Sequence, residues 1–256
     1  MSGGDIISNL VNTVGTSPMV VSEVFRYIRN TDEKLKHVTL IYTKDSEVSA
    51  GVNAVIGAIG YRYGDVKFHR HETEIDDISD QKSLEKFLDD FADVMNIQKS
   101  YDKNIYLNVT GGRKIQGIAM AIYGSFAGIK EIYNVIHTDV KNYNEHFERV
   151  KNYIIDNFSG MIKDDEAISR YEMYKDKLDP VFFPDPKKLV MLKIPLITLP
   201  RSEVENIRRV IDGISLEDGS IEDFRIDSYV ESGFITKDRR MTYPTELGRI
   251  VRKMIQ

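Results

Sequence analysis

Short apolar stretches alternate with longer segments of helical periodicity along the first half of the chain. The apolar stretches predict strands at residues 6–14, 37–43, 66–73, 104–110 and 131–138. The segments between them repeat apolar residues every three or four positions and predict helices at 18–29, 46–62, about 80–98 and about 112–126. Strands that alternate with helices favour right-handed crossovers and a mostly parallel sheet covered by helices on both faces. We therefore expect an α/β, Rossmann-like domain over residues 1–143.

A helical, proline-containing connector is expected over residues 144–200. An amphipathic helix is predicted at 144–157, and five of the seven prolines follow within 159–200. One apolar run, at 189–199, interrupts this region. We interpret the run as part of the connector, where it would serve as a strand or as a dimer contact.

The pattern changes again over residues 201–256. A helix at 202–212 is followed by a short second helix, the triplet Gly-Phe-Ile, a polar tight turn, a strand-like Met-Thr-Tyr and a closing helix. This order is typical of a winged helix-turn-helix, so we predict such a domain at 201–256.

Composition and charge narrow the functional classes. The chain has no cysteine, which excludes disulfides and cysteine-type zinc sites and fits a reducing compartment. It shows no signal-peptide pattern and no apolar run near the roughly 20 residues of a membrane span. We therefore expect a cytoplasmic protein with no membrane partner. The formal net charge of −5 excludes a surface covered by basic patches, so any contact with nucleic acid must be local.

The loop after the first predicted strand carries a candidate anion site. Gly15 permits a tight exit from the strand, and Thr16 and Ser17 bring hydroxyls to the start of the next helix. A helix N-terminus attracts phosphate through its unpaired N–H groups and its partial positive charge. The alternative is that Thr16 or Ser17 only caps the helix, although the two roles can coexist.

The loop after the fourth predicted strand, Thr110-Gly111-Gly112-Arg113-Lys114, has the same character. The two glycines let the backbone approach a ligand closely, and the guanidinium fork of Arg113 suits bidentate contact with phosphate. A cation at a helix N-terminus costs roughly 0.3–1 kcal/mol, so two of them indicate an anion that offsets the cost. The alternative is an ordinary strand-to-helix turn with solvated Arg113 and Lys114.

Together, the segments "GTSPMVVSEVF" and "NVTGGRK" resemble the paired motifs of CARF domains, the CRISPR-associated Rossmann folds, and most closely the branch that contains ring nucleases. The resemblance covers about the first 140 residues. It implies a homodimer that binds a cyclic oligoadenylate, commonly cyclic tetra-adenylate, across its two-fold axis. The ligand-binding residues that it implies are Gly15, Thr16, Ser17, Thr110, Gly111, Gly112, Arg113 and Lys114.

Two functions are compatible with this resemblance, and the first is a ring nuclease that ends type III CRISPR antiviral signalling. RNA supplies its own nucleophile, the 2′-hydroxyl, so the reaction needs no metal and no cofactor. We assign Ser17 to orienting the ribose and phosphate, and Lys114 and Arg113 to stabilising the charge that develops on the phosphate and the leaving oxygen. A purely ligand-binding role for Lys114 is the alternative.

The second function is a transcription regulator that binds the ring without cleaving it and moves the winged helix on DNA. Residues 201–256 carry ten Lys and Arg against eleven Asp and Glu, which is a poor balance for neutralising phosphates. Arg239 and Arg240 in the predicted wing are among the few cations placed to contact DNA. We therefore favour the nuclease and expect the winged helix to dimerise or to cover the site.

Weaker candidates lie at other strand ends. Thr43 and His137 end two strands at the predicted ligand edge and are expected to contact the ligand. His69 and His71 share one strand face, but a third ligand is missing from the pattern, so we predict no metal site. Asp76-Asp77 is interpreted as a solvated loop.

Overall fold

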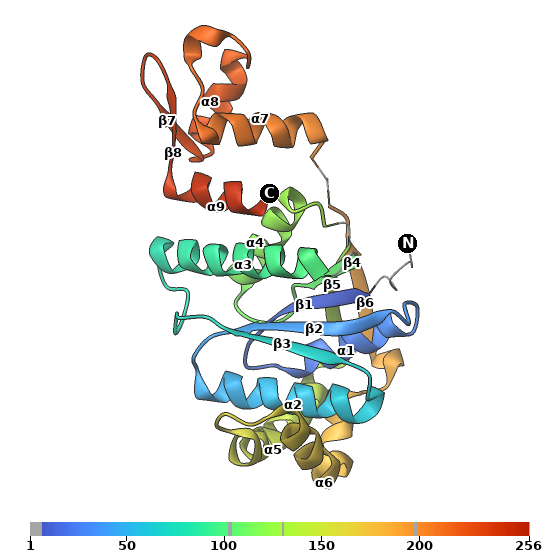
Figure 1. The fold of residues 1–256 in the computed structure, drawn as a ribbon. Helices are drawn as coiled ribbons and strands as arrows, with labels where there is room; N and C mark the ends of the chain where they lie inside the picture. Colours follow the sequence, from blue (N-terminus) through green and yellow to red (C-terminus); the bar gives the residue numbers. More distant parts are fainter. Residues whose placement is uncertain (1–6, 102–103, 130, 197–198, 256) are drawn as a thin grey trace.

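Six strands form one sheet in the computed structural model, which describes residues 7–101, 104–129, 131–196 and 199–255. The strands are β1 Ser8–Val14, β2 Leu35–Tyr42, β3 Lys67–Glu72, β4 Asn104–Asn108, β5 Glu131–His137 and β6 Leu189–Ile194. Their spatial order is β3-β2-β1-β4-β5-β6 (Figure 1), and β6 alone runs antiparallel to its neighbour. The predicted α/β fold with a mostly parallel sheet is confirmed. Residue 6 of the first predicted strand and residues 197–198 of the predicted apolar run lie outside the described residues.

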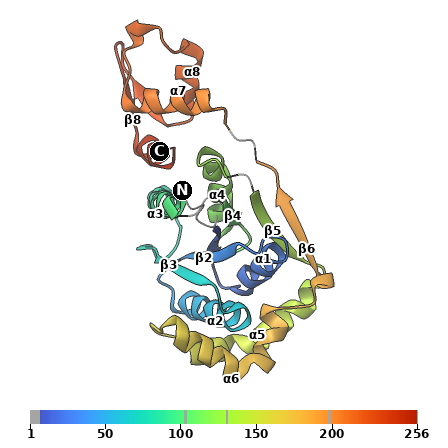
Figure 2. The ribbon, with the colours of Figure 1, turned by 45° about the vertical axis from the view of Figure 1, so that its right-hand side comes forward.

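Helices cover both faces of this sheet (Figures 1 and 2). Helices α1 and α2 cover one face, and α5 and α6 pack outside α2, whereas α3 and α4 cover the other face. The helices span α1 Met19–Arg29, α2 Ser46–Tyr63, α3 Gln81–Tyr101, α4 Lys114–Phe126, α5 Val140–Phe158 and α6 Asp164–Phe182. The buried apolar side chains accordingly form two clusters, one on each side of the sheet.

The central strand β1 is buried along its whole length although it contains several polar residues. Asn108 of β4 donates through its side-chain amide to the side-chain oxygen Oδ1 of Asn12 at 2.9 Å. Asn9 donates to Gln98 of α3 at 2.8 Å. Buried amides must find such partners, so these bonds specify which strand and helix lie beside β1. The Asn12–Asn108 bond in particular fixes β1 against β4, the pair from which the two candidate loops leave.

The structure contains a long helix where the sequence pattern gave no clear element. Three acidic residues at its start, Asp164 to Glu166, suit the positive end of the helix dipole, and Arg70 of β3 donates to Asp164 at 2.7 Å. Pro180 lies in the last turn of this helix, α6. The apolar run at 189–199 supplies β6, which pairs with β5 along six residues.

The C-terminal elements form a unit that packs on the α3 side of the sheet (Figures 1 and 2). They are α7 Arg201–Asp212, α8 Asp223–Glu231, β7 Ile235–Lys237, β8 Thr242–Pro244 and α9 Glu246–Met254, with a short 3₁₀ turn at Leu216–Asp218; another 3₁₀ turn, Pro186–Lys188, precedes β6. Lys253 of α9 forms ion pairs with Asp89 and Asp93 of α3 at 2.6 and 2.9 Å. Among the described helices, none combines the length and the apolar content that a membrane crossing requires.

Candidate functional site

The strand order creates a switch point between β1 and β4. The chain leaves β1 toward β2 on one side, and it leaves β4 toward β5 on the other. Crossovers that diverge in this way open a crevice beyond the carboxyl ends of the two strands, where open α/β sheets bind ligands. Both candidate loops, residues 15–18 and 109–113, leave the sheet at this point.

The two loops touch through their backbones. The Thr13 hydroxyl donates to the Gly111 carbonyl at 2.8 Å. A Cβ atom at Gly15 would lie 2.9 Å from the Gly112 Cα, and one at Gly111 would lie 2.1 Å from the Thr13 carbonyl oxygen. Gly112 also has a φ of +74°, which favours glycine. The glycines therefore let two helix N-termini, those of α1 and α4, converge on one place.

Replacing Gly111 by alanine should lower the free energy of unfolding by about 3 kcal/mol, which is near the upper end of the range for overpacking. The cost is high because the new methyl group meets backbone atoms, which cannot move aside as a side chain can. Urea denaturation measures this difference. Gly219→Ala is the matched control: its Cβ would meet nothing within 4 Å, and only its left-handed φ of +59° costs about 1 kcal/mol. Equal losses for the two variants would contradict the close contact of the loops.

Ser17 and Lys114 are exposed where the two helices begin. Within the described residues no side chain caps α1, so the Ser17 hydroxyl is not used as a cap there. Helix α4 is different, because the Gln116 side chain accepts a hydrogen bond from the Arg113 backbone N–H at 2.7 Å. That bond holds the start of α4 and leaves the side chains of Arg113 and Lys114 outside the helix end.

A cavity of about 440 Å³ opens beside these loops. Arg113 lines it, and two of its guanidinium nitrogens donate to the Asp77 carboxylate, Nε at 2.8 Å and Nη2 at 2.5 Å. The lining residues are Val14, Gly15, Thr16, Thr43, Asp45, Val48, Asp76, Asp77, Gly112, Arg113 and Gln116. The predicted Thr43 thus lies with the two loops, whereas Ser17 and Lys114 are not part of the lining.

Comparisons with known proteins place the chain in a family. A profile of the family described as CRISPR-associated protein NE0113 matches residues 17–219, which is well over half of the chain. The chain belongs to this family. It is also 30% identical over 146 residues to the CRISPR system ring nuclease SSO2081 of Saccharolobus solfataricus, a match that covers 56% of this chain and 78% of the relative.

Three solved structures are more distant from this NE0113-family chain. Enterococcus italicus Csm6 bound to cyclic hexa-2′-fluoro-hexa-dAMP is 14% identical with a TM-score of 0.47, covering 80% of this chain and 45% of Csm6. Can2 from Sulfobacillus thermosulfidooxidans in complex with cyclic tetra-adenylate is 19% identical with a TM-score of 0.32, covering 49% and 31%. Protein VC1899 from Vibrio cholerae is 9% identical with a TM-score of 0.38, covering 96% and 64%. The chain spans less than two thirds of each of these three proteins.

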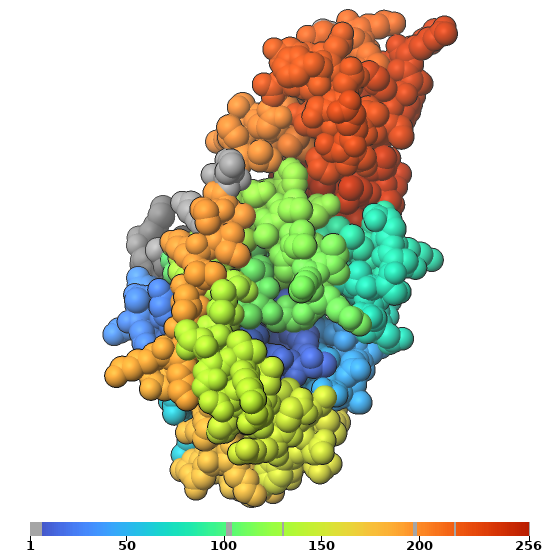
Figure 3. Space-filling model, turned by 180° about the vertical axis from the view of Figure 1, so that it is seen from behind, coloured from blue at the N-terminus to red at the C-terminus, as the bar shows by residue number. Residues whose placement is uncertain are grey.

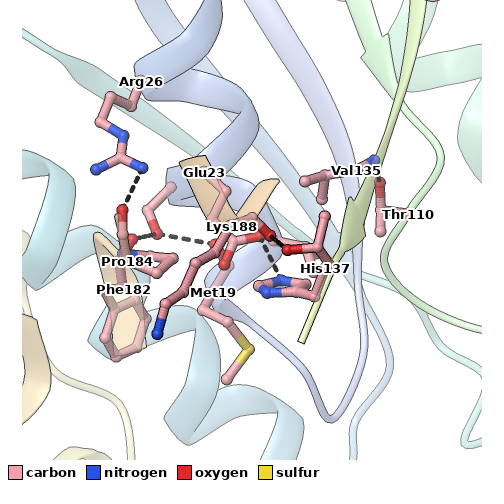
Figure 4. Close-up of polar contacts among 12 residues, drawn as sticks. Met19, Glu23, Arg26, Thr110, Val135, His137, Phe182, Pro184 and Lys188 are labelled. Carbon is pink, nitrogen blue, oxygen red and sulfur yellow. Dashed lines mark hydrogen bonds and ion pairs between the residues drawn. The ribbon is translucent and has the colours of Figure 1, made fainter. Parts of the chain in front are cut away.

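Thr110 of this NE0113-family chain has a structural bond. Its hydroxyl oxygen accepts from the backbone N–H of Val135 at 2.9 Å (Figure 4), and its own N–H donates to the Asn108 side chain at 3.0 Å. These bonds tie the loop to β5 and to the end of β4. The Thr110 hydroxyl retains its hydrogen for a further partner.

His137 lies away from the other predicted residues. Its Nε2 is 3.1 Å from a carboxylate oxygen of Glu23 on α1 (Figure 4), and its ring lies 3.5 Å from that of Tyr143, centre to centre. Burial raises the pKa of Glu23, and the neighbouring His137 opposes that rise. Burial, with Glu23 beside it, also raises the pKa of Tyr143. His137 and Tyr143 line a second cavity of about 370 Å³, which contains none of the residues of the two loops.

Sequence reasoning missed Asp77, Asp45 and Gln116 in the NE0113-family site. Asp77 is exposed, as a solvated loop predicts, but it also forms an ion pair with Arg113 that the sequence did not indicate. Asp45 accepts from the N–H groups of Glu47 and Val48 and so caps α2. No group of three or more His, Asp or Glu side chains suited to a metal ion occurs in the part of the chain that the structure describes.

Proposed function

We propose that this chain is a CARF-type ring nuclease that binds and cleaves cyclic tetra-adenylate, and thereby ends type III CRISPR antiviral signalling. The observation that carries the proposal is the backbone contact between Gly15 and Gly112, which brings two helix N-termini and their exposed Ser17 and Lys114 to the switch point. Adjacent helix N-termini favour phosphate groups. Membership of the family and the likeness to the Saccharolobus solfataricus ring nuclease support the same reading.

The chemistry needs only positioning and charge stabilisation. The ribose 2′-oxygen attacks the adjacent phosphorus and loses its proton to water. The bond from phosphorus to the 5′-oxygen breaks, the leaving 5′-oxygen takes a proton from water, and the products are a 2′,3′-cyclic phosphate and a 5′-hydroxyl. Ser17 orients the ribose and phosphate, and Arg113 and Lys114 stabilise the charge on the phosphate and the leaving oxygen.

The active form is proposed to be a homodimer, and an exposed apolar surface supports this. Ile115, Ile118 and Ile122 lie one helical turn or two apart on α4 and are 36%, 55% and 53% exposed. Ile136 of β5 and two β6 residues, Val190 and Leu192, are also exposed. Ile136 points to the α4 side, since Ile132, four residues earlier on the same strand, packs in the core with α4.

This apolar surface, defined as those six residues, adjoins the site because α4 begins at Lys114. Figure 3 brings α4 (green) and β6 (orange) to the same face of the molecule. Contiguous exposed apolar surface of this kind marks a protein interface. A two-fold axis there would bring two Lys114 residues and two loop pairs around one cyclic polyanion.

Cleavage of labelled cyclic tetra-adenylate tests the proposal. With EDTA present, we expect linear fragments that end in 2′,3′-cyclic phosphate, formed at the rate measured without EDTA. A rate that falls with EDTA would contradict the metal-independent mechanism. A ring that binds but stays intact would contradict the nuclease, and a ring that does not bind would contradict ligand recognition altogether.

A transcription regulator is the second candidate, because the C-terminal elements follow the order of a winged helix. Arg239 and Arg240 are exposed in the turn between β7 and β8. The exposed face of α8, however, carries Asp223, Asp227 and Glu231, which would repel DNA phosphates. DNA that shifts in a gel only when the intact ring is added would support the regulator.

A further inference from the structure

Asp77 and Arg113 both line the cavity of about 440 Å³ and form a bidentate ion pair there. The Arg113 nitrogens Nε and Nη2 bind the two Asp77 oxygens at 2.8 and 2.5 Å. Each partner is also fixed locally: Gln116 holds the Arg113 backbone, and the Ile78 N–H donates to the Asp77 carboxylate at 2.8 Å. The pair is solvent-exposed, with 66% of the Arg113 side chain and 44% of the Asp77 side chain accessible. It can therefore open without unfolding the loop that carries it.

The charges around the cavity do not suit a polyanion while this pair is closed. Among the described residues that line the cavity, Arg113 is the single cation, whereas Asp45, Asp76 and Asp77 are acidic. One Asp45 oxygen is occupied by two backbone N–H groups of α2. A phosphate that enters meets carboxylates and a guanidinium whose charge is already neutralised.

We propose that Asp77 is an intramolecular competitor for the ligand phosphate, so that the ring binds by replacing the Asp77 carboxylate on Arg113. This inference rests on the proposed function. A carboxylate presents two oxygens to the guanidinium fork in the same geometry as a phosphate, so one can take the place of the other. Asp77 thereby holds Arg113 in a ready conformation and at the same time lowers the affinity for every phosphate.

The exchange also raises the concentration that each ligand needs, by the same factor for every ligand that uses Arg113. A ligand that reaches only Arg113 trades one bidentate anion for another and gains little. A ring that in addition contacts the start of α1 at Ser17 and the exposed Lys114 gains interactions that Asp77 never offered. A single nucleotide therefore gains too little binding free energy to displace Asp77 from Arg113, whereas a multivalent ring gains enough.

The test is the dissociation constant of a cyclic tetra-adenylate that carries 2′-fluoro groups in place of the 2′-hydroxyls, which lacks the nucleophile and stays intact. Asp77→Asn should bind it about two- to five-fold more tightly, which is the range expected for loss of an exposed ion pair. Asp76→Asn is the matched control, because it removes the same charge from the same cavity without breaking the pair, and it should change the affinity by less than about 1.5-fold. In an Arg113→Ala background, Asp77→Asn should have no effect.

Equal or weaker binding by Asp77→Asn would overturn the competitor role and would show that Asp77 positions Arg113 or contacts the ligand itself. Equal tightening by Asp76→Asn would overturn it too, since general charge would then explain the gain. Failure of the unaltered protein to bind the ring would instead overturn the proposed function, and this is measured first.

Discussion

Replacing Lys114 by alanine is expected to slow cleavage of cyclic tetra-adenylate by about 10²- to 10³-fold, the usual cost of removing one donor that stabilises a transition state. Lys114 is the first residue of α4, it is exposed, and its backbone is held close to the glycine contact with the other loop. The loss should fall on kcat, because the charge on the leaving oxygen exists only as the bond breaks. Single-turnover kinetics with labelled ring measures it directly.

A purely ligand-binding role for Lys114 predicts a different result. A lysine that only binds the ring would raise KM and leave kcat unchanged when removed. Lys67→Ala is the matched control, because Lys67 is an exposed lysine at the start of β3 and so lies at the opposite edge of the parallel sheet. A large loss in the Lys67 variant would show that net charge, rather than position, determines the rate.

The candidate site was predictable from the sequence to the extent that its residue types indicate a particular chemistry. Glycine, hydroxyl and cationic residues directly after an apolar strand indicate an anion site whatever the rest of the chain does. The contact of Gly15 with Gly112 was not readable, because it depends on β1 and β4 being neighbours in the sheet. That adjacency rests on pairing between residues nearly a hundred positions apart, such as Asn12 with Asn108.

Two features that the sequence did not predict have clear physical causes. Asp77 looks the same in a sequence whether it is solvated or paired, and only its position after β3, at the carboxyl edge, could have indicated a partner. Pro180 made α6 hard to predict, because proline removes a backbone hydrogen bond and disfavours a helix interior, whereas in α6 it lies two residues before the helix ends.

The location of the His137 side chain follows from the alternation of side chains between the two faces of a strand. It does lie at the predicted edge of the sheet, but it alternates with Ile136 and so shares a face with Val135 and Tyr133. Both of those residues pack in the α1–α2 core. His137 consequently faces Glu23 of α1, away from the cavity at Thr43. His137 remains a predicted ligand contact, although it lines the second cavity and not the one beside the two loops.

Replacing Ile118 by aspartate should convert the proposed dimer to monomers and reduce cleavage at least about 100-fold. Burying a fully exposed isoleucine contributes about 1.5–3 kcal/mol, so the exposed 55% of Ile118 contributes about half of that, and a two-fold interface counts each substitution twice. An unpaired carboxylate buried in the interface costs several kcal/mol more, so the total exceeds the roughly 2.7 kcal/mol that a 100-fold change in dimer dissociation requires. Ile118 is 55% exposed in the single chain, so the fold itself should keep its stability. Sedimentation velocity at several concentrations, beside the cleavage assay, measures both effects.

The matched control is Met173→Asp, which places the same charge on an equally exposed apolar position of α6, away from the apolar surface. It should leave both association and cleavage as they are. If Ile118→Asp dimerises and cleaves normally, the two-fold axis cannot run along α4. If the unaltered chain is a monomer that cleaves the ring, one pair of loops suffices, and the proposal that two subunits surround the ring is wrong. Two Lys114 side chains repel each other at close range unless an anion lies between them. Binding of the ring should therefore strengthen the dimer, and adding the 2′-fluoro ring should shift the monomer–dimer equilibrium toward the dimer.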